Sequence, residues 1–305
     1  MSATLDALYY GFYVEGLRRV FGRARWCTPP LEGVTGMAFE VGGRRFYICA
    51  QDHADIDPGP LAWCDVFGKV NARGELPPKV VAIGPGFGIT AWSRTRSAAA
   101  AVSSVAFRSE RTPRQTIVDL RRQWRYRLPE PRVVPGSVDP GRVFFASTIW
   151  LKESATNEAR ATFLRTVQAR PELTLDGGFA PRYDGSVTAF DDLVAPRVSY
   201  RTYLEATRRS AFVFNTPAVL GCHGWKLAEF LALGKAIIST PLTNDMPAPF
   251  VAGRHFHPAD PTAESIDTAI DALADLDYRR HLEHHARRYY LDHLAPDAVI
   301  RRLIA

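Results

Sequence analysis

Several features that identify common protein classes are missing from this chain of 305 residues. Only four cysteines are present, widely spaced and with no C-x-x-C pair, which argues against a zinc site and favours buried free thiols. No apolar run approaches the roughly 20 residues that cross a bilayer. The N-terminal segment carries Asp6 and Glu15 and lacks the basic start of a secretory signal peptide. We therefore expect a cytoplasmic location.

Common catalytic motifs are also missing. The chain contains no G-x-S-x-G, no P-loop and no H-E-x-x-H, so nothing indicates a hydrolase of those types. Gly84, Gly86 and Gly88 form G-x-G-x-G, with Ile89 where the dinucleotide fingerprint G-x-G-x-x-G has its last glycine. This partial match leaves a nicotinamide or flavin enzyme as one alternative.

Positive charge is in excess, and almost all of it comes from arginine. The formal net charge is +6, and only five of the 38 basic residues are lysines. The planar guanidinium group of arginine matches the geometry of phosphate. The net positive charge is therefore compatible with anionic donors, anionic acceptors, membrane surfaces and nucleic acid. Because the arginines are scattered along the chain, we expect no nucleic-acid partner.

The first half of the sequence predicts short strands and irregular loops. Residues 6–12 predict a strand that runs into a turn at Gly11, and residues 14–22 predict a short helix. A hairpin over 36–52 would turn at Gly42-Gly43, and a strand over 79–83 would lead into a glycine loop. Apolar residues at helical spacing predict an amphipathic helix over 113–128.

Residues 129–141 are dense in proline and glycine, which predicts a linker between a domain at 1–130 and a domain at 131–305. After this linker, strands alternate with helices. Strands are expected at 142–148, 172–179, 211–217 and 235–240, and helices at 157–169, 199–210 and 224–234. This alternation predicts an α/β fold with a doubly wound parallel sheet, in which ligands bind at the carboxyl ends of the strands.

One loop and the helix after it combine several groups suited to a nucleotide. The loop at 218–224 leads into a helix near Trp225, whose N-terminus attracts phosphate. Lys226 in the first turn would add a charge to the same anion, and Glu229 one turn further could accept hydrogen bonds from ribose hydroxyls. An ion pair between Lys226 and Glu229 is the alternative explanation of this spacing.

The segment 203–240 resembles the nucleotide-sugar-binding segment of GT-B glycosyltransferases. The residues that match in order are Tyr203, Phe212 to Pro217, Gly221, Glu229, Ala232, Gly234 and Lys235. The resemblance implies two Rossmann-like domains that face a cleft, the N-terminal one smaller and more irregular and holding the acceptor. It also implies that the C-terminal domain binds the donor, with the last helix free to cross back. In that family the glutamate holds ribose, and no metal or cofactor is required.

Candidate donor-binding residues follow from this resemblance and from the strand ends. They are Thr148, Lys152, Arg160, Cys222, His223, Gly224, Trp225, Lys226 and Glu229. Loop residues expected at the cleft are Gly11, Gly84 and Gly86. One position departs from the family: many retaining members have an acidic residue where this chain has Gly221, so retention or inversion stays open.

An inverting transferase must deprotonate the acceptor hydroxyl, and His53 or Asp52 after an early strand is the candidate base. Asp55 and Asp57 form a D-x-D, which binds a metal in other glycosyltransferases; we expect no metal site here.

The sequence as a whole predicts a glycosyltransferase of carbohydrate biosynthesis. Its partners would be a nucleotide sugar and an acceptor, which would be a glycan, a lipid-linked sugar or a small molecule. The net positive charge would allow peripheral contact with a membrane. The alternatives are a nucleotide-sugar epimerase on the same fold and a non-catalytic nucleotide-sugar-binding protein.

Overall fold

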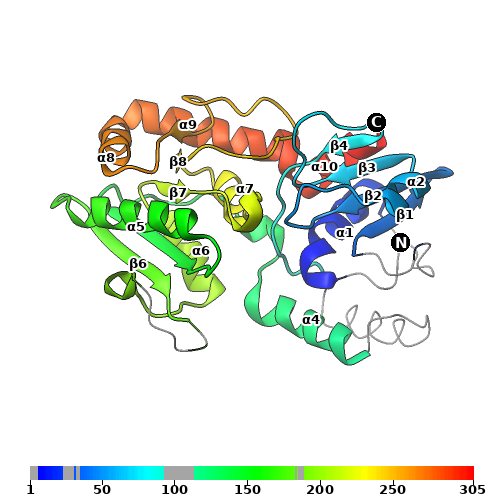
Figure 1. Cartoon of the computed structure of the whole chain (residues 1–305), viewed down its shortest axis with the longest axis horizontal. Coiled ribbons are helices and arrows are strands. Elements are labelled where there is room, and N and C mark those ends of the chain that lie inside the picture. The colour runs from blue at the N-terminus through cyan, green and yellow to red at the C-terminus, as the bar shows by residue number, and fades with distance from the viewer. Residues whose placement is uncertain (1–5, 23–30, 32–34, 93–112, 183, 185–188) are drawn as a thin grey trace. The chain divides into compact units, whose positions relative to one another are not determined.

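The computed structural model describes the chain except for residues 1–5, 23–30, 32–34, 93–112, 183 and 185–188. The chain forms two compact units (Figure 1). Unit 1 consists of residues up to Arg132 together with 244–249 and 291–305, and unit 2 consists of 133–243 and 250–290. The C-terminal residues therefore cluster with the N-terminal ones.

Unit 1 contains a four-stranded sheet in the order β1-β2-β3-β4. Its strands are β1 (Met37–Val41), β2 (Arg44–Cys49), β3 (Val66–Lys69) and β4 (Val80–Ala82). The hairpin predicted over 36–52 is confirmed: β1 and β2 are antiparallel, and the turn residues Gly42 and Gly43 have φ of +58° and +79°. The other neighbouring strands pair in parallel.

The helices of unit 1 are α1 (Ala7–Phe21), α2 (Pro58–Trp63), α4 (Pro113–Tyr126) and α10 (Pro296–Ile304). A short 3₁₀ turn, η1 (Glu130–Arg132), ends the first part of the unit, and a π-helical turn, η4 (Tyr290–Leu294), precedes α10. The helix predicted over 113–128 is confirmed by α4, but of its expected apolar face only Leu120 is buried, whereas Ile117 and Trp124 are exposed.

The predicted strand at 6–12 is wrong, because residues 7–21 form the single helix α1. Asp6 caps this helix by accepting hydrogen bonds from the backbone N–H groups of Leu8 and Tyr9. Gly11 therefore lies inside a helix and not in a cleft loop. A Cβ at Gly11 would lie 3.0 Å from Nε2 of Gln123 on α4, so this glycine allows a close helix contact.

A second glycine on α1 allows an even closer contact with the C-terminal helix α10. A Cβ at Gly16 would lie 2.1 Å from the carbonyl oxygen of Pro296, which leaves no room for a side chain.

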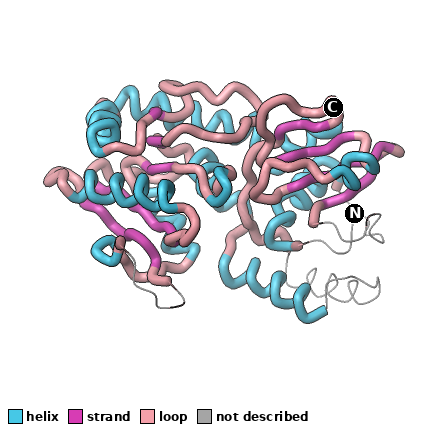
Figure 2. Tube along the Cα trace, viewed as in Figure 1, coloured by secondary structure: helices cyan, strands magenta, loops and turns pink. Residues whose placement is uncertain are grey.

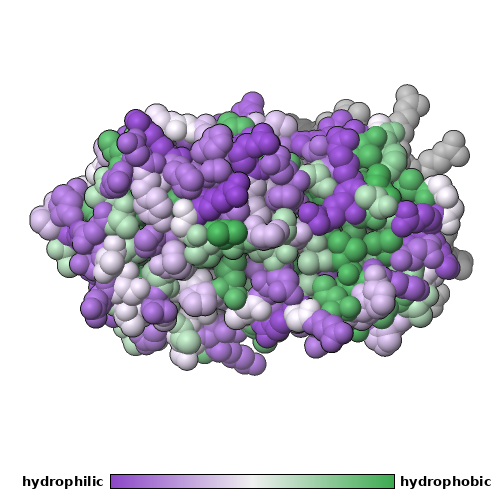
Figure 3. Space-filling view, turned by 90° about the horizontal axis from the view of Figure 1, so that it is seen from above, coloured by the Kyte–Doolittle hydropathy of each residue, from purple (hydrophilic) through white to green (hydrophobic). Residues whose placement is uncertain are grey.

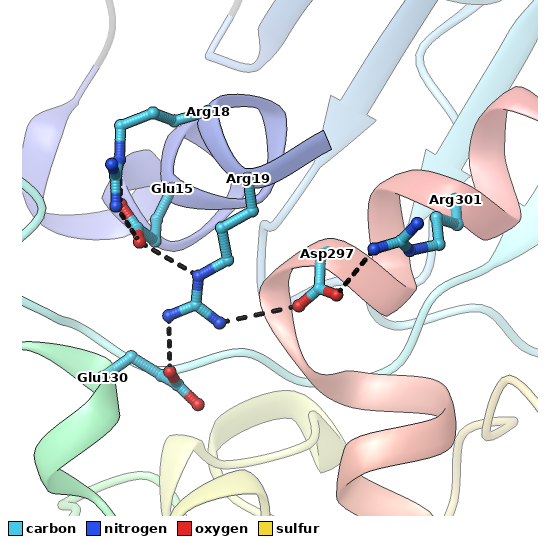
Figure 4. A network of polar contacts seen from close by, with 6 residues as sticks. All are labelled: Glu15, Arg18, Arg19, Glu130, Asp297 and Arg301. Atoms are coloured by element: carbon cyan, nitrogen blue, oxygen red, sulfur yellow. Dashed lines mark hydrogen bonds and ion pairs between the residues drawn. The ribbon is translucent and has the colours of Figure 1, made fainter. Parts of the chain in front are cut away.

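On the same helix, Arg19 contacts three carboxylates: Glu15 at 3.0 Å, Glu130 at 2.6 Å and Asp297 at 3.5 Å (Figure 4). Arg19 thereby joins α1, η1 and α10 within unit 1.

Unit 2 is built from parallel strands. They are β5 (Arg142–Thr148), β6 (Thr174–Ala180), β7 (Val213–Asn215), β8 (Ile237–Ser239) and β9 (His257–Pro258). Strand β5 pairs with β6, and β7, β8 and β9 form a second ladder. A backbone hydrogen bond of 2.6 Å from Ala211 to Arg142 links the two ladders beside β7 and β5. Because all pairs are parallel, the strands of each ladder end at one edge.

Helices alternate with these strands (Figure 2). They are α5 (Ser154–Gln168), α6 (Tyr200–Arg209), α7 (Trp225–Ala232), α8 (Ala263–Ala272) and α9 (Leu276–Tyr289), with 3₁₀ turns η2 (Asp191–Leu193) and η3 (Val219–Gly221). Helix α5 packs against β6 and α8, and α7 packs against β7 and α9. In the core, Phe163 of α5 stacks on Phe214 of β7, with ring centroids 4.4 Å apart. The predicted α/β class with a parallel sheet is confirmed.

Within the described part of the chain, every helix is too short or too polar to cross a membrane. In the face drawn in Figure 3, hydrophilic residues predominate, and hydrophobic residues gather mainly towards the right of the view. The three described cysteines, Cys49, Cys64 and Cys222, are buried free thiols as predicted, and Cys27 lies outside the described residues.

Candidate functional site

The predicted anion-binding loop lies between β7 and α7 in unit 2. It turns through Leu220 and Gly221, whose φ values are +56° and +72°. A positive φ at a residue other than glycine costs of the order of 1 kcal/mol and persists only where neighbours enforce it. Here the Leu220 N–H donates to Oε1 of Glu153 at 2.9 Å, and Ala218 N–H donates to the Cys222 carbonyl at 2.9 Å. The loop is thus held in one shape.

The loop ends at Gly224, which begins α7 without a side-chain cap. The first turn of a helix has backbone N–H groups that no helical carbonyl accepts, and its dipole favours an anion there. Lys226 lies in this first turn, as predicted.

Arg160 of α5 reaches the carboxyl end of β7. It is 6% exposed, and its Nε donates to Oγ1 of Thr216 at 3.0 Å. Its Nη1 is buried and has no hydrogen-bond partner among the described residues. Burial lowers the pKa of Arg160 to about 10. A buried donor without an acceptor is costly, which indicates a place that a ligand can fill.

Lys226 approaches the same region from α7. Its ammonium donates to the carbonyl of Ala146 on β5 and lies 5.2 Å from the centre of the Phe145 ring. Burial, and less strongly the charge of Arg160, lower the pKa of Lys226 to about 7, although the charge of Glu229 opposes the shift. The predicted alternative, an ion pair with Glu229, is not formed.

Arg160 and Lys226 therefore make a cationic pair, whose pKa values are raised somewhat, against the lowering by burial, by the carboxylates of Glu153 and Glu229. Neither cation forms a salt bridge within the described part of the chain, and the positive charge of Arg160 disfavours the charged form of Lys226. A buried cation and a half-buried cation so close together are stabilised when a negative group binds between them, because that group offsets the lost hydration. A phosphate or diphosphate matches this charge and these donors.

Glu229 is 3% exposed and lies one turn after Lys226 on α7. Its Oε1 accepts from the phenol of Tyr200 at 3.0 Å, and its Oε2 accepts from the phenol of Tyr203 at 2.9 Å. A carboxylate is thus accommodated in a buried helix because α6 supplies a donor to each oxygen. Tyr203 belonged to the matched segment, but the part played by Tyr200 was missed. The signal for it was two tyrosines three residues apart, on one face of a helix.

The matched Gly-Lys pair has a structural role. Gly234 has φ of +59° and ends α7, and Lys235 is 1% exposed. The ammonium of Lys235 donates to the carbonyls of Arg208, at 3.1 Å, and Ser210, which lie at the end of α6. Lys235 therefore fixes the helix that carries Tyr200 and Tyr203.

The other predicted donor-side residues are placed as follows. Cys222 and His223 are 3% and 6% exposed, and Cys222 lies near Arg160. Thr148 is exposed at the end of β5, Lys152 is exposed before α5, and Gly224 and Trp225 are half-buried. The structure brings together Arg160, Cys222, Lys226 and Glu229, and no contact of the described residues joins Lys152 to them.

The predicted base residues lie in unit 1, after β2. Asp52 is exposed, and Nε2 of His53 contacts the side chain of Gln51. The His53 Nδ1 lies 3.6 Å from a carboxylate oxygen of Asp55. Their catalytic role stays a prediction.

The D-x-D pair is partly committed to local structure, since Asp57 caps α2 by accepting from Gly59 N–H at 3.0 Å. Among the described residues, no group of three histidine, cysteine or acidic side chains could hold a metal ion.

The glycine loop after β4 is shaped by packing. Gly84 has φ of +65°, and a Cβ there would lie 2.7 Å from Cδ2 of Leu294. A Cβ at Gly86 would lie 2.9 Å from the ring of Phe12. These contacts within unit 1 explain both glycines without a dinucleotide. In the described residues directly after this loop, up to 92, no helix begins.

No protein-family model and no curated protein sequence matches the chain. Its fold resembles those of solved glycosyltransferases. A glycosyltransferase from Rickettsia africae is 9% identical, with a TM-score of 0.46 over 97% of this chain and 79% of that one. WaaG, a glycosyltransferase involved in lipopolysaccharide biosynthesis, is 12% identical, with a TM-score of 0.40 over 98% and 96%. TarM is 10% identical, with a TM-score of 0.40 over 55% of this chain, which spans only 35% of TarM. These likenesses concern the fold and assign no activity.

Proposed function

We propose that this protein is a glycosyltransferase that moves a sugar from a nucleotide sugar to an acceptor hydroxyl. The observation that carries the proposal is the pair of buried Arg160, whose Nη1 has no hydrogen-bond partner among the described residues, and half-buried Lys226 in the first turn of α7. The segment that carries Lys226 and Glu229 is the one whose sequence resembles nucleotide-sugar-binding domains.

In this proposal the donor diphosphate lies against Arg160, Lys226 and the first turn of α7. When the bond between the sugar C1 and the diphosphate oxygen breaks, negative charge grows on the diphosphate. Fixed cations and backbone dipoles stabilise that charge in a site shielded from water. These groups come from the chain itself, so we propose that transfer requires no metal and no cofactor.

The new bond joins the acceptor oxygen to the sugar C1, and the proton of the acceptor hydroxyl must leave. We retain His53 and Asp52 as the candidate bases for an inverting reaction. The acceptor is proposed to be a glycan, a lipid-linked sugar or a small molecule, in carbohydrate biosynthesis.

The test is incubation with each common nucleotide sugar, followed by separation of donor, free nucleotide and sugar products. A glycosyltransferase releases nucleoside diphosphate and forms a glycoside, or slowly hydrolyses the donor when no acceptor is present. Formation of an isomeric donor without released nucleotide would instead indicate an epimerase, and binding without turnover would indicate a binding protein. Arg160→Gln should abolish release of the nucleotide, and the exposed Arg165→Gln on the same helix serves as its control.

A further inference from the structure

We propose that Cys49 and Lys69 of unit 1 form a site of oxidative modification, where a hydroperoxide joins the cysteine Sγ to the lysine Nζ as a sulfenamide. The inference is independent of the proposed function, because neither residue belongs to the anion site of unit 2.

The fold places these two side chains opposite each other. Cys49 is the last residue of β2 and Lys69 is the last residue of β3, and the register of the two parallel strands pairs them. Paired residues of neighbouring strands lie on the same face of a sheet. The Nζ of Lys69 donates to Sγ of Cys49 at 3.2 Å, so the two atoms that would form the bond are already in contact.

Lys69 lies in surroundings that rarely hold a lysine. The residue is 0% exposed, and among the described residues the cysteine sulfur is the hydrogen-bond partner of its Nζ, with no carboxylate in an ion pair. An ammonium has three donors, and burying it beside one weak acceptor is costly. The pair can exist as an ammonium beside a thiolate or as an amine beside a thiol. Either form places a nucleophile at the contact.

The sulfur lies close to a partly exposed part of the chain. Cys49 is 6% exposed, and residues 50–53, which follow it directly, are half-buried or exposed. On its other sides the thiol has neutral neighbours, because burial, and less strongly Cys49 itself, raise the pKa of Tyr10 and Tyr13. A molecule as small as hydrogen peroxide therefore has a short way to the sulfur, and Lys69 is the reactive group that it meets there.

The reaction balances with one molecule of peroxide. The thiolate attacks a peroxide oxygen, the O–O bond breaks, and the departing hydroxide takes a proton from the ammonium to form water, which leaves a sulfenic acid beside an amine. The amine nitrogen then attacks the sulfur, the S–OH bond breaks, and hydroxide leaves with an N–H proton as a second water. Sulfur gives up two electrons and peroxide accepts them. The product is a neutral S–N bond that ties the end of β2 to the end of β3.

The experiment treats the folded protein with hydrogen peroxide, blocks the remaining thiols, and maps tryptic peptides by mass spectrometry without reductant. Trypsin cleaves after free lysine and arginine, so the untreated protein yields the peptide 46–69, which holds Cys49, Cys64 and Lys69. After oxidation we expect cleavage at Lys69 to be lost. The peptide 46–73 should appear instead, with Cys49 and Lys69 linked and two hydrogens missing, and dithiothreitol should restore the cleavage.

Cys64→Ser is the matched control. The Sγ of Cys64 contacts the Leu61 carbonyl at 3.9 Å, and the nearby Lys79 donates to the backbone carbonyl of Cys64 at 3.1 Å. A lysine is thus close to this cysteine as well, but its Nζ is bonded to the backbone. Cys64→Ser should therefore keep the link, whereas Cys49→Ser should keep cleavage at Lys69 after peroxide. If Cys49→Ser does not fold, the peptides of wild type decide, because their fragmentation locates the link.

The inference is refuted if oxidised wild type is still cleaved after Lys69. That outcome includes a disulfide between Cys49 and Cys64, and oxidation of Cys49 to a sulfinic or sulfonic acid with the lysine free. Loss of cleavage at Lys69 in folded Cys49→Ser would refute it as well, because the lysine would then react without the cysteine.

Discussion

Replacing Lys226 with methionine is expected to stabilise the free protein while removing its response to nucleoside diphosphates. Burial and Arg160 lower the pKa of Lys226 from 10.5 to about 7. At about pH 7.5 the unfolded chain carries this charge, whereas the folded chain must give up the proton or bury the charge. The shift corresponds to an upper limit of about 4 kcal/mol of lost stability.

Methionine fills a similar volume and has no charge to desolvate. It also loses the contacts with the Ala146 carbonyl and the Phe145 ring, which we take as about 1–2 kcal/mol. The expected net gain is therefore about 1–3 kcal/mol, or a few degrees in Tm for a protein of this size. A gain in stability with loss of binding is the signature of a site that is strained for its ligand.

The lowered pKa of Lys226 determines how the stability of the wild-type protein changes with pH. Between about pH 7 and pH 10.5 the unfolded state binds more protons at Lys226 than the folded state, so the stability of wild type rises with pH. The advantage of Lys226→Met should thus be largest near or below pH 7 and shrink steadily towards pH 10.

The assay is thermal or urea unfolding of both proteins at several pH values, with and without nucleoside diphosphate. The control is Lys79→Met, whose ammonium also donates to a carbonyl, that of Cys64 at 3.1 Å, but in unit 1. It should show no stabilisation. The reasoning is refuted if Lys226→Met lowers Tm and still responds to nucleotide as wild type does.

Three further substitutions test the packing described above. Arg19→Met should destabilise the protein by about 2 kcal/mol in urea unfolding, because it removes the guanidinium that joins Glu15 and Glu130, both 9% exposed, whereas Arg18→Met, whose side chain is 49% exposed, should cost less than about 1 kcal/mol. Gly16→Ala should cost about 3 kcal/mol or more, since its Cβ would lie 2.1 Å from a backbone oxygen of α10; a Tm equal to wild type would contradict this packing. Ser210→Ala should lower the free energy of unfolding by about 2 kcal/mol in urea. The reason is that the fully buried hydroxyl accepts from Phe144 N–H at 2.9 Å and donates to the Phe212 carbonyl at 2.6 Å. An unchanged unfolding midpoint would show that these backbone groups find other partners.

Much of unit 2 could be predicted from the sequence because its signals are local. Strands and helices alternate from 142 to 240. This order along the chain is typical of a parallel sheet and can be recognised without knowledge of tertiary contacts. The failure at 6–12 has the opposite cause. Aromatic residues are frequent there, as in many strands, but the Asp6 cap and the contacts of Gly11 and Gly16 with distant helices select a helix.

The candidate site was predictable where one segment supplies it and unpredictable where segments meet. Lys226 follows from its place in the first turn of α7. The unpartnered Nη1 of Arg160 depends on a fold that buries α5 against β7, which the sequence does not display. Likewise, the bond from Tyr200 to Glu229 joins residues 29 positions apart on two helices.

The most direct test of the central claim is calorimetric titration of nucleoside diphosphates, and of the matching nucleosides, into wild type and Arg160→Gln. The account predicts that one diphosphate binds wild type far more tightly than its nucleoside, and that Arg160→Gln, folded by circular dichroism, loses that difference. If no diphosphate binds wild type, or if Arg160→Gln binds it equally well, the cationic pair in unit 2 is not a donor site.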